Sequence, residues 1–355
     1  MHMRGARDWN SIPENVGDPD FSNILALLRR EEPARPTLFE FFLNGRLHQR
    51  LTPGLSPEGR EDVAEGIVKI HAFRNAGYDY ATLKVDSFWF HSGEAERRET
   101  RSLNDGALIK DRKSFDEYEW PNPDENNYEI LAGLKDELLP GMKLIVHAPG
   151  GVLENFIRIV GYENMCFMRM DDEQLMFDIF ENIGKRLLRY YERCLEHDSV
   201  GAVIGNDDWG FKSQTMLAPE DMRKFVFPWH RKIVEAAHSS GRPAILHSCG
   251  NLSSVMDDVI DEMAYDGKHS YEDGIQPVEE AYEQYHDRIA IMGGIDVDFV
   301  CRADPGQVYE RSLSMLERTR GRGGFGLGTG NSVPEYVPDE GYFAMIGAAL
   351  DMRRR

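Results

Sequence analysis

The sequence predicts an α/β protein built as a single (β/α)8 barrel of the TIM type. Short apolar runs alternate along the chain with segments of helical periodicity, and this alternation is typical of a parallel sheet. Eight such units fit within 355 residues, which is a usual length for this barrel. The alternative is an open doubly wound sheet, but the sequence has neither a Gly-x-Gly-x-x-Gly stretch after its first strand nor a Walker phosphate loop to favour it.

The first 36 residues form a polar leader with several prolines, in which residues 21–30 have the spacing of a helix. The barrel is expected over residues 37–355. Its predicted strands are short and mostly apolar, and they are Thr37–Leu43, Tyr80–Val85, Lys143–His147, Gly201–Gly205, Ala244–His247, Gly267–Ser270, Ile289–Gly293 and Gly324–Gly328. Its predicted helices are Glu58–Ala76, Leu153–Val160, Asp171–His197, Ala218–Ser240, Ser253–Met263, Glu279–Tyr285, Pro305–Arg320 and Asp339–Arg354.

A long excursion follows the second strand, over residues 87–141. It is mostly polar, and it contains aromatic residues and a run of prolines and acids. A loop of this length inside a compact domain is usually a lid or a substrate-facing segment. An insertion without functional weight is the alternative.

The charge balance and the cysteines limit the possible partners and compartments. Acidic residues number 61 and basic residues 41, for a formal net charge of −20. Such a surface repels nucleic acid and anionic membranes, so we expect neither as a partner. No apolar run reaches the roughly 18 residues of a membrane helix, and the first residues lack the apolar core of a signal peptide. Four scattered cysteines fit a reduced, cytoplasmic protein.

The fifth predicted strand ends in His247-Ser248-Cys249-Gly250-Asn251. Side chains two positions apart on a strand point to the same face, so His247 and Cys249 are expected to leave the strand together. Imidazole and thiolate are both good ligands for zinc. The alternative is a core strand whose last turn happens to contain a histidine and a cysteine.

Polar residues follow the other predicted strands as well. In a TIM barrel the active site lies at the carboxyl ends of the strands, so these side chains are expected to converge on one cavity. They are Glu40, Asn44 and Arg46 at the first strand, Asp86, His147, then Asn206, Asp207 and Asp208, then Lys268, His269 and Glu272, then Asp296, and finally Thr329 and Asn331. Individually several have structural alternatives: Asp207 or Asp208 could cap a loop, Asp296 could cap a helix, and His147 could be a core histidine.

The stretch Leu217–Asn251 starts with Leu-Ala-Pro-Glu-Asp and ends with Ile-Leu-His-Ser-Cys-Gly-Asn. It resembles the signature of the uroporphyrinogen decarboxylase superfamily, an α/β-barrel family. The pieces Gly293–Asp296 and Gly324–Pro334 also match in kind, and the resemblance runs from about residue 37 to the end. The superfamily includes the decarboxylases themselves and a large group of corrinoid-dependent methyltransferases.

The decarboxylases are matched poorly at their substrate-binding positions. Where they have an arginine-rich stretch near the first strand, this sequence has one arginine, Arg46. Asp86 matches their pyrrole-binding aspartate, but Asn155 stands at their tyrosine and Thr329 at their last-strand histidine. A polyanionic porphyrinogen is poorly suited to a site that is short of arginine and rich in carboxylates.

The methyltransferase branch is matched better, through Lys268–Asp273 and Gly328–Pro334. Its zinc-containing members hold the metal with the His-x-Cys pair and a cysteine after the last strand. His247 and Cys249 match the pair, whereas Thr329 stands at or beside the third ligand. A carboxylate from Asp208, Glu154 or Glu272 completes the site, or no zinc binds.

The resemblance therefore implies a methyltransferase that performs O-demethylation of a small donor, such as a methyl ether. The acceptor would be cobalamin on a separate corrinoid protein, because this chain has no Asp-x-His-x-x-Gly motif. The implied catalytic residues are Asp86, His147, Asp208, His247 and Glu272. The implied substrate-binding residues are Glu40, Asn44, Asn206, Asp207, His269, Asp296, Thr329 and Asn331. The alternatives are a tetrapyrrole decarboxylase and a non-enzymatic barrel that binds a tetrapyrrole or small ligand.

Overall fold

The computed structural model describes residues 8–85, 88–93 and 102–354 of the chain. The chain divides into two compact units. Unit 1 comprises Met1–Leu83, Ala132–Ile145 and Asp266–Arg355, and unit 2 comprises Lys84–Leu131 and Val146–Tyr265. The chain passes between the units after residues 83, 131, 145 and 265, so each unit is built from segments that are distant in sequence.

The chain alternates strands with helices, as the sequence predicts. The strands are β1 (Tyr80–Leu83), β2 (Lys143–His147), β3 (Val200–Asn206), β4 (Ala244–His247), β5 (Gly267–His269), β6 (Ala290–Met292) and β7 (Phe325–Gly326). The helices are α1 (Ser22–Leu28), α2 (Gly45–Leu51), α3 (Glu61–Ala76), α4 (Arg112–Glu117), α5 (Glu129–Gly133), α6 (Val152–Val160), α7 (Tyr162–Asp171), α8 (Glu173–Leu195), α9 (Pro219–Asp221), α10 (Phe227–Ser239), α11 (Val278–Tyr285), α12 (Val297–Arg302), α13 (Pro305–Thr319) and α14 (Asp339–Arg353). Short 3-10 turns η1 (Pro123–Glu125) and η2 (Leu134–Glu137) and π-helical turns η3 (Met222–Val226) and η4 (Asp258–Glu262) complete the set.

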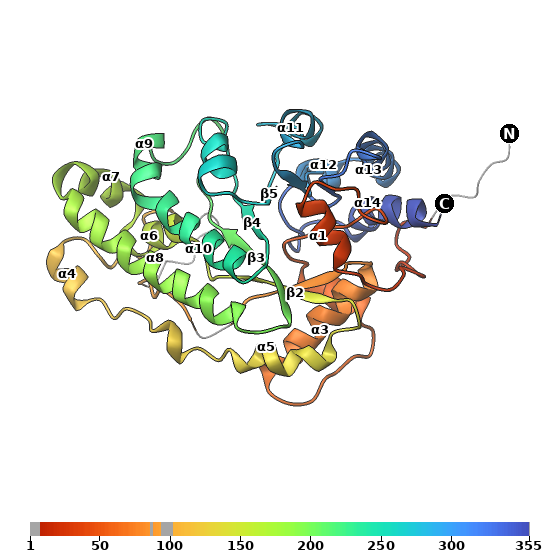
Figure 1. The fold of residues 1–355 in the computed structure, drawn as a ribbon, viewed down its shortest axis with the longest axis horizontal. Helices are drawn as coiled ribbons and strands as arrows, with labels where there is room; N and C mark the ends of the chain where they lie inside the picture. The colour runs from red at the N-terminus through yellow and green to blue at the C-terminus, as the bar shows by residue number, and fades with distance from the viewer. Residues whose placement is uncertain (1–7, 86–87, 94–101, 355) are drawn as a thin grey trace. The chain divides into compact units, whose positions relative to one another are not determined.

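Unit 2 is organised around the parallel pair β3 and β4. Asn206 pairs in register with His247, so the carboxyl ends of the two strands lie level. Helices α8 and α10 pack against each other (Figure 1), and they do so closely because Gly184 of α8 leaves room for the Trp229 ring of α10: a Cβ on Gly184 would lie 2.0 Å from it. The core of this unit therefore fixes the end of the β3–β4 pair, where the polar residues stand.

Unit 1 contains the parallel strands β5, β6 and β7, paired in chain order. Helices α13 and α14 pack against each other beside them. α14 is lined by buried residues over almost its whole length, from Gly341 to Leu350. In both units, strands that neighbour each other in the sheet also neighbour each other in the chain, which is the pattern of repeated β–α units.

The first predicted strand, Thr37–Leu43, is wrong as a continuous strand. Among the described residues it has two isolated parallel bridges, Leu38 with Leu327 and Leu43 with Val333. Its residues still lie beside the last strand, since Phe39 donates to Leu327 O at 2.8 Å and Leu327 donates to Thr37 O at 2.9 Å. The buried position was predicted correctly, but the ladder is interrupted between the two bridges.

Two predicted helices are broken in the structure, and a third starts two residues later than predicted. The helix predicted over 171–197 starts instead at Glu173, where the Asp172 side chain caps α8 by accepting from Leu175 N at 2.9 Å, and α7 precedes it. The helix predicted over 218–240 contains the π-helical turn η3, in which Phe227 N bonds Met222 O five residues back. Pro228, which follows, has no backbone N–H to continue the helical pattern. The segment 253–263 forms only a short helical turn that ends in η4.

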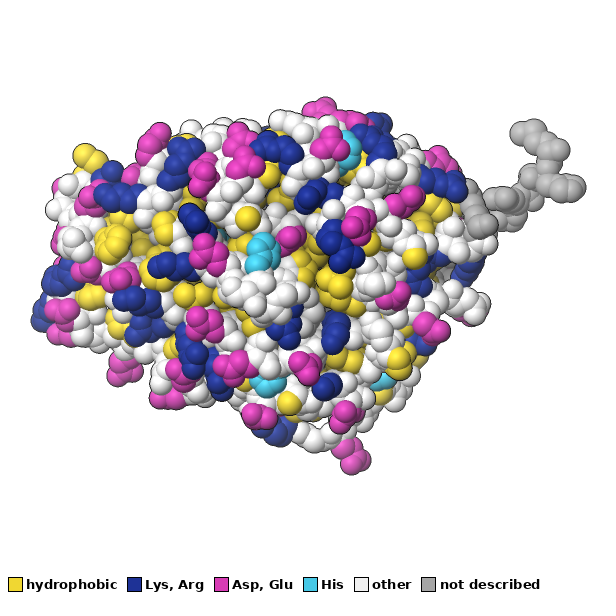
Figure 2. All heavy atoms as spheres, in the orientation of Figure 1, with side chains coloured by type: hydrophobic (Ala, Val, Ile, Leu, Met, Phe, Trp, Pro, Cys, Tyr) yellow, Lys and Arg dark blue, Asp and Glu magenta, His cyan; other side chains and the backbone are white. Residues whose placement is uncertain are grey.

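The excursion after the second strand contains short helices that its polar sequence did not predict. They are α4, which Asp111 and Ser114 cap reciprocally, together with η1, α5 and η2. Within the described part of the chain, no helix combines the length and apolarity needed to cross a membrane. Acidic and basic side chains are interspersed on the face drawn in Figure 2.

Candidate functional site

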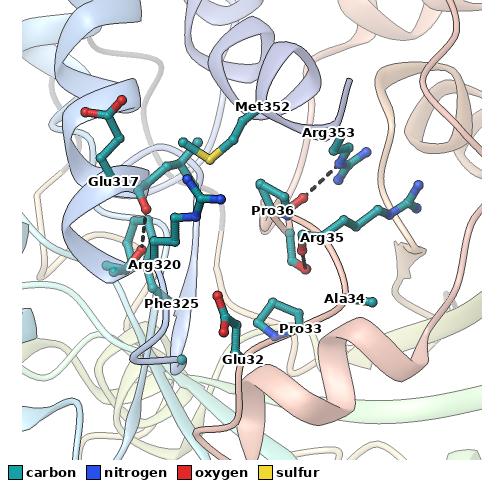
Figure 3. Close-up of a pocket in the computed structure, with 14 residues that line it drawn as sticks. Glu32, Pro33, Ala34, Arg35, Pro36, Glu317, Arg320, Phe325, Met352 and Arg353 are labelled. Carbon is teal, nitrogen blue, oxygen red and sulfur yellow. Dashed lines mark hydrogen bonds between the residues drawn. The ribbon is translucent and has the colours of Figure 1, made fainter. Parts of the chain in front are cut away.

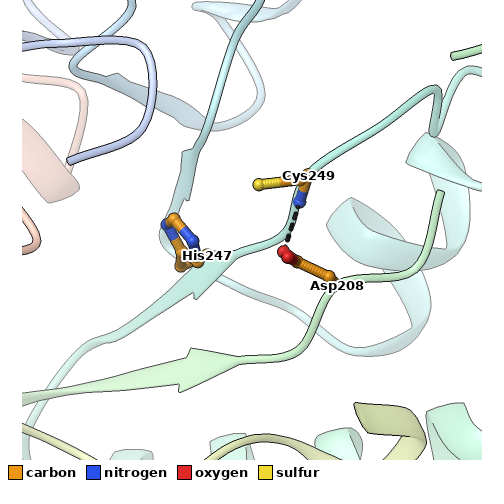
Figure 4. A group of neighbouring side chains, drawn as sticks. All are labelled: Asp208, His247 and Cys249. Carbon is orange, nitrogen blue, oxygen red and sulfur yellow. Dashed lines mark hydrogen bonds between the residues drawn. The ribbon is translucent and has the colours of Figure 1, made fainter. Parts of the chain in front are cut away.

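Three potential metal ligands come together in unit 2. They are Asp208, two residues past β3, His247, the last residue of β4, and Cys249, and their ligand atoms all lie within 4.8 Å of one another (Figure 4). His247 is buried, while Asp208 and Cys249 are half-buried. The structure thus places the two residues of the His-x-Cys pair together and adds the carboxylate that the sequence analysis named among several candidates.

Backbone hydrogen bonds hold the two loops that carry these ligands side by side. Asp207 N donates to His247 O at 2.9 Å, and Gly210 N donates to Cys249 O at 3.1 Å. Between them, Cys249 N donates to Asp208 Oδ1 at 2.9 Å.

A glycine after Cys249 is required by this close approach of the two loops. Gly250 has φ of +87°, and a Cβ there would lie 2.1 Å from Gly210 O. Only glycine adopts this conformation without strain and leaves room for the neighbouring backbone. The Cys-Gly pair of the sequence is thus a requirement of the loop that presents Cys249.

Glu154 provides a further carboxyl in this unit, in the first turn of α6. Its Oε2 accepts from Gly151 N at 2.9 Å. Removal from water, followed by the negative charges of Asp208 and Asp207, raises the pKa of Glu154 to about 8. A carboxyl with that pKa carries its proton at neutral pH. The sequence analysis named Glu154 only as a possible zinc ligand and not as an acid, because no local pattern reveals this burial.

Asp207 has a structural position. It is fully buried, and its carboxylate accepts from Leu153 N at 2.9 Å and Glu154 N at 2.8 Å. It also contacts His230 Nε2 at 2.9 Å. Asp207, which was predicted from the sequence as a substrate-binding residue, therefore anchors the start of α6 from a fully buried position.

Two other predicted residues of unit 2 lie near the strand ends. His147 closes β2 and is half-buried, with Nδ1 3.2 Å from Ala148 O. Asn206 closes β3, and its Oδ1 is buried without a hydrogen-bond partner among the described residues. Asp86 lies outside the described residues.

A second polar cluster lies in unit 1, around Glu40. This side chain is fully buried and accepts from Thr329 N at 2.6 Å and Thr329 Oγ1 at 2.9 Å. Its backbone N and O both contact the Tyr80 hydroxyl, at 2.7 and 2.8 Å. Burial raises the pKa of Glu40 to about 8, against the lowering effect of the two Thr329 contacts. Glu40 is thus a neutral carboxyl held inside the core at neutral pH.

His269 joins the same cluster, and Lys268 lies beside it. His269 Nε2 is 3.1 Å from Thr329 O, and burial lowers the pKa of this imidazole to about 3. His269 is therefore neutral at physiological pH. Lys268 is buried, lies 4.1 Å from the centre of the Tyr271 ring and donates to Ser270 O.

The remaining predicted residues of unit 1 are mostly structural. Asn44 caps α2 by accepting from Leu47 N at 2.8 Å, and Asp296 caps α12 by accepting from Phe299 N at 3.0 Å. Glu272 is exposed, and Asn331 is half-buried and accepts from Ser332 Oγ at 3.1 Å. The alternative that Asp296 caps the helix after it is thereby confirmed.

The guanidinium group of Arg46 is fully engaged in hydrogen bonds within unit 1. Its Nε donates to Asp339 Oδ1 at 2.9 Å, Nη1 to Glu335 O at 2.8 Å and Nη2 to Val337 O at 2.7 Å. All three guanidinium nitrogens are engaged in holding α2 to the segment before α14. This arginine is not free to bind a carboxylated substrate without giving up those contacts.

A cavity of about 420 Å³ also lies in unit 1 (Figure 3). Its lining includes Glu32, Arg35, Arg320 and, at the end of α14, Arg353. None of the site residues predicted from the sequence lines it. It adjoins the amino ends of the first strand segment and β7, whereas active sites of this fold class lie at the carboxyl ends.

The strand-end ligands and the parallel β–α pattern define an α/β-barrel protein with a potential metal centre after its strands. The sequence model of uroporphyrinogen decarboxylase (URO-D) matches residues 102–351. The chain therefore belongs to the uroporphyrinogen decarboxylase family. This membership supports the prediction that the protein is an enzyme.

Solved structures are similar to this chain in fold. A methyltransferase from Methanosarcina mazei has a TM-score of 0.68 at 14% sequence identity, covering 94% of this chain and 99% of its own. A β-glycosidase from Thermosphaera aggregans has a TM-score of 0.43 at 10% identity, covering 82% and 84%. A xylanase from Thermoanaerobacterium saccharolyticum has a TM-score of 0.39 at 11% identity, covering 88% and 98%. No curated protein matches the sequence. The fold class predicted from the sequence, an α/β barrel of the TIM type, is confirmed by the first of these.

Proposed function

We propose that this protein is a corrinoid-dependent methyltransferase that moves a methyl group from a small donor, such as a methyl ether, to cobalamin on a separate protein. The observation that carries the proposal is the cluster of Asp208, His247 and Cys249. The fold similarity to a methyltransferase over 94% of the chain supports it. So does the resemblance of the sequence to the methyltransferase branch of the family.

The donor set of the cluster fits zinc. One carboxylate oxygen, one imidazole nitrogen and one thiolate sulfur are all ligands that zinc accepts, and three protein ligands leave a fourth position for a substrate. Tetrahedral zinc, with bonds of about 2.0–2.3 Å, holds its ligand atoms about 3.3–3.8 Å apart. The ligand atoms here lie within 4.8 Å of one another. Asp208, His247 and Cys249 would hold the metal.

Methyl transfer requires the bond between the methyl carbon and the oxygen of the donor to be broken. The methyl carbon forms a bond to cobalt while its bond to oxygen breaks, and the oxygen leaves with the electron pair and needs a proton. Zinc, when bound, supplies a Lewis acid that stabilises charge on that oxygen. Burial is the largest cause that raises the pKa of Glu154, and this effect suits Glu154 to supply the proton.

A uroporphyrinogen decarboxylase is the second candidate, because the matching family carries that description. That reaction needs cationic side chains to bind several substrate carboxylates. Arg46 stands where the decarboxylases have their arginine-rich stretch, and it is committed to Asp339 and two carbonyl oxygens. The geometry of Arg46 therefore favours the methyltransferase.

Metal analysis is the first test of the proposal. Protein purified without chelator and measured by plasma mass spectrometry is expected to contain about one zinc per chain, as a three-residue site implies. Substitution of His247 by Ala is expected to remove it. Zinc retained by His247→Ala would place the metal elsewhere and overturn this assignment.

Methyl transfer is the second test. The protein is incubated with cob(I)alamin-loaded corrinoid protein and a panel of aryl and alkyl methyl ethers, and the cobalamin absorption spectrum is followed. A donor that changes the spectrum to that of the methylated cofactor supports the proposal. A spectrum unchanged by every donor, together with carbon dioxide release from uroporphyrinogen, would instead establish the decarboxylase.

A further inference from the structure

A chain of three buried polar side chains runs through the core of unit 2. His230 of α10 contacts Asp207 Oδ2 through Nε2 at 2.9 Å and the Tyr265 hydroxyl through Nδ1 at 2.8 Å. The exposed fractions of Asp207, His230 and Tyr265 are 0%, 1% and 3%. The sequence analysis gave neither His230 nor Tyr265 a role.

This chain ends next to the candidate metal ligands. Asp207 directly precedes Asp208, and its backbone N donates to the carbonyl oxygen of His247 at 2.9 Å. Its carboxylate also holds the first turn of α6, through Leu153 N and Glu154 N. Displacement of Asp207 would therefore shift the positions of Asp208, His247 and Glu154.

His230 also contacts the residue on the other side of Asp208. Its ring meets the Trp209 ring edge-on, with centroids 4.8 Å apart, and Trp209 N donates to Ser248 Oγ at 3.2 Å. One imidazole thus fixes both neighbours of Asp208, Asp207 by a hydrogen bond and Trp209 by packing. Ser248 lies between His247 and Cys249, so the loop after β4 is fixed through the same contact.

Tyr265 anchors the far end of the chain. Its hydroxyl packs against β3, where a Cβ on Gly205 would lie 2.2 Å from it. The imidazole is therefore held from both of its nitrogens, which fixes the direction in which it donates to Asp207. Packing alone does not require such a chain, because burying polar groups costs free energy that apolar side chains of similar volume avoid.

We propose that the Asp207–His230–Tyr265 chain positions the Asp208, His247 and Cys249 side chains for metal binding, and that His230 is its central positioning residue. The inference rests on the metal site assigned under the proposed function. Groups that orient metal ligands from outside typically contribute about 10–100-fold to metal affinity. None of the three residues needs to touch the metal.

Two substitutions of His230 distinguish the loss of its hydrogen bond to Asp207 from the loss of the imidazole ring itself. His230→Gln reaches far enough to place an amide N–H where Nε2 stands and keeps the donor to Asp207. His230→Asn is shorter, reaches only the position of Nδ1 and leaves Asp207 without that donor. Metal-free full-length protein is titrated with cobalt(II), and the absorption bands of thiolate-bound cobalt report affinity and geometry together. Tyr282→Phe, which removes the hydroxyl that donates to Gly323 O in unit 1, is the control for loss of a buried hydrogen bond elsewhere.

The expected result is about 10–100-fold weaker cobalt binding with altered bands in His230→Asn, and near-normal binding in His230→Gln and Tyr282→Phe. Wild-type affinity and bands in His230→Asn would overturn the inference, and so would equal losses in the Asn and Gln variants. Far-UV circular dichroism confirms that each variant is folded.

A metal-independent measurement distinguishes failure of this inference from failure of the proposed function. The alkylation rate of Cys249 in metal-free protein is measured by peptide mass spectrometry, with Cys301 of unit 1 as internal reference. Loosening of the loop in His230→Asn is expected to speed alkylation of Cys249 and leave Cys301 unchanged. If the wild type binds no cobalt, the metal site is wrong, yet faster alkylation of Cys249 in His230→Asn still supports the positioning role. An unchanged rate overturns it.

Discussion

The polar clusters of the two units differ in what surrounds them. In unit 2, Asp208 and Cys249 keep part of their surface exposed, and their ligand atoms and that of His247 converge within 4.8 Å. In unit 1, Glu40, His269 and Thr329 are fully buried, and Glu40 and His269 both bond to Thr329. Both clusters follow predicted strands, and both consist of residue types that serve as ligands or acids.

The difference shows that burial decides which polar residues are available for chemistry. A buried group is stable when its hydrogen bonds are satisfied within the protein, which describes the Glu40 cluster. Burial also keeps Glu40 and His269 uncharged, by raising the pKa of the first to about 8 and lowering that of the second to about 3. The unit 2 cluster keeps the partial exposure that a metal or substrate needs.

The largest effect is expected from Glu40→Gln. The unfolded carboxyl titrates near 4.5 and the folded one near 8, so between these values the folded state binds one proton more than the unfolded state. Stability is therefore full below pH 4.5 and falls as pH rises to 8, by about 1.4 kcal/mol per pH unit. Gln keeps an acceptor for Thr329 N and has no charge to bury. Urea denaturation should show Glu40→Gln several kcal/mol more stable than the wild type at pH 8, with a smaller difference at pH 5.

Glu283→Gln is the matched control for this measurement. Glu283 lies on α11 in the same unit, and its hydrogen bonds with Arg322 hold its pKa near 2. It is charged in both states above pH 5, so its substitution should change stability equally at pH 5 and pH 8. The wild type is expected to lose stability relative to Glu40→Gln between pH 5 and pH 8. If it does not, Glu40 is not a neutral buried carboxyl.

Cys249→Ser is expected to have the next largest effect. The quantity that it changes is the metal content of the protein and not its stability. Loss of a direct thiolate ligand should cost more than the 10–100-fold that outer groups contribute, and methyl transfer should fall with it. Cys166→Ser, at an exposed cysteine of the same unit, is the control. Zinc measured after dialysis checks the result, and equal zinc content in both variants would remove the unit 2 cluster as the metal site.

Thr329→Val tests whether the unit 1 cluster is structural. The variant loses the hydroxyl that contacts Glu40 Oε2 at 2.9 Å, which should lower the free energy of unfolding by about 1–3 kcal/mol. Zinc content should not change. Thr329→Ser keeps the hydroxyl and should recover most of the stability. Loss of zinc in Thr329→Val would show that the two clusters are not separate in function.

Asp208→Asn should have the smallest effect of the four. Asn retains an oxygen that accepts from Cys249 N, so the loop keeps its shape while the site loses one negative charge. Zinc affinity is expected to fall, because a neutral amide oxygen binds zinc more weakly than a carboxylate does, but by less than in Cys249→Ser, with an unchanged thermal midpoint. A lower midpoint would assign Asp208 to folding and not to metal binding.

Much of the fold follows from local pattern. The strands Lys143–His147 and Ala244–His247 have the predicted bounds, because a short apolar run bounded by turn residues is a local signal. The start of α8 was predicted to within two residues, whereas the break around η3 was missed, because the periodicity of apolar residues continues through it. The interruption of the first strand was missed. An apolar run indicates that a segment is buried, but it does not indicate whether its backbone hydrogen bonds form a continuous ladder.

The sequence by itself determined the fold class, the family and the position of His247 and Cys249 at a strand end, because periodicity, spacing and motif are properties of neighbouring residues. Only the tertiary structure decided which carboxylate joins them. Asp207 and Asp208 are adjacent and chemically alike, yet one is sealed against α6 and His230 and the other faces Cys249. That division depends on groups of α6, of α10 and of the loop after β4, which lie 23 to 54 residues away along the chain and meet the two aspartates only when the unit is packed.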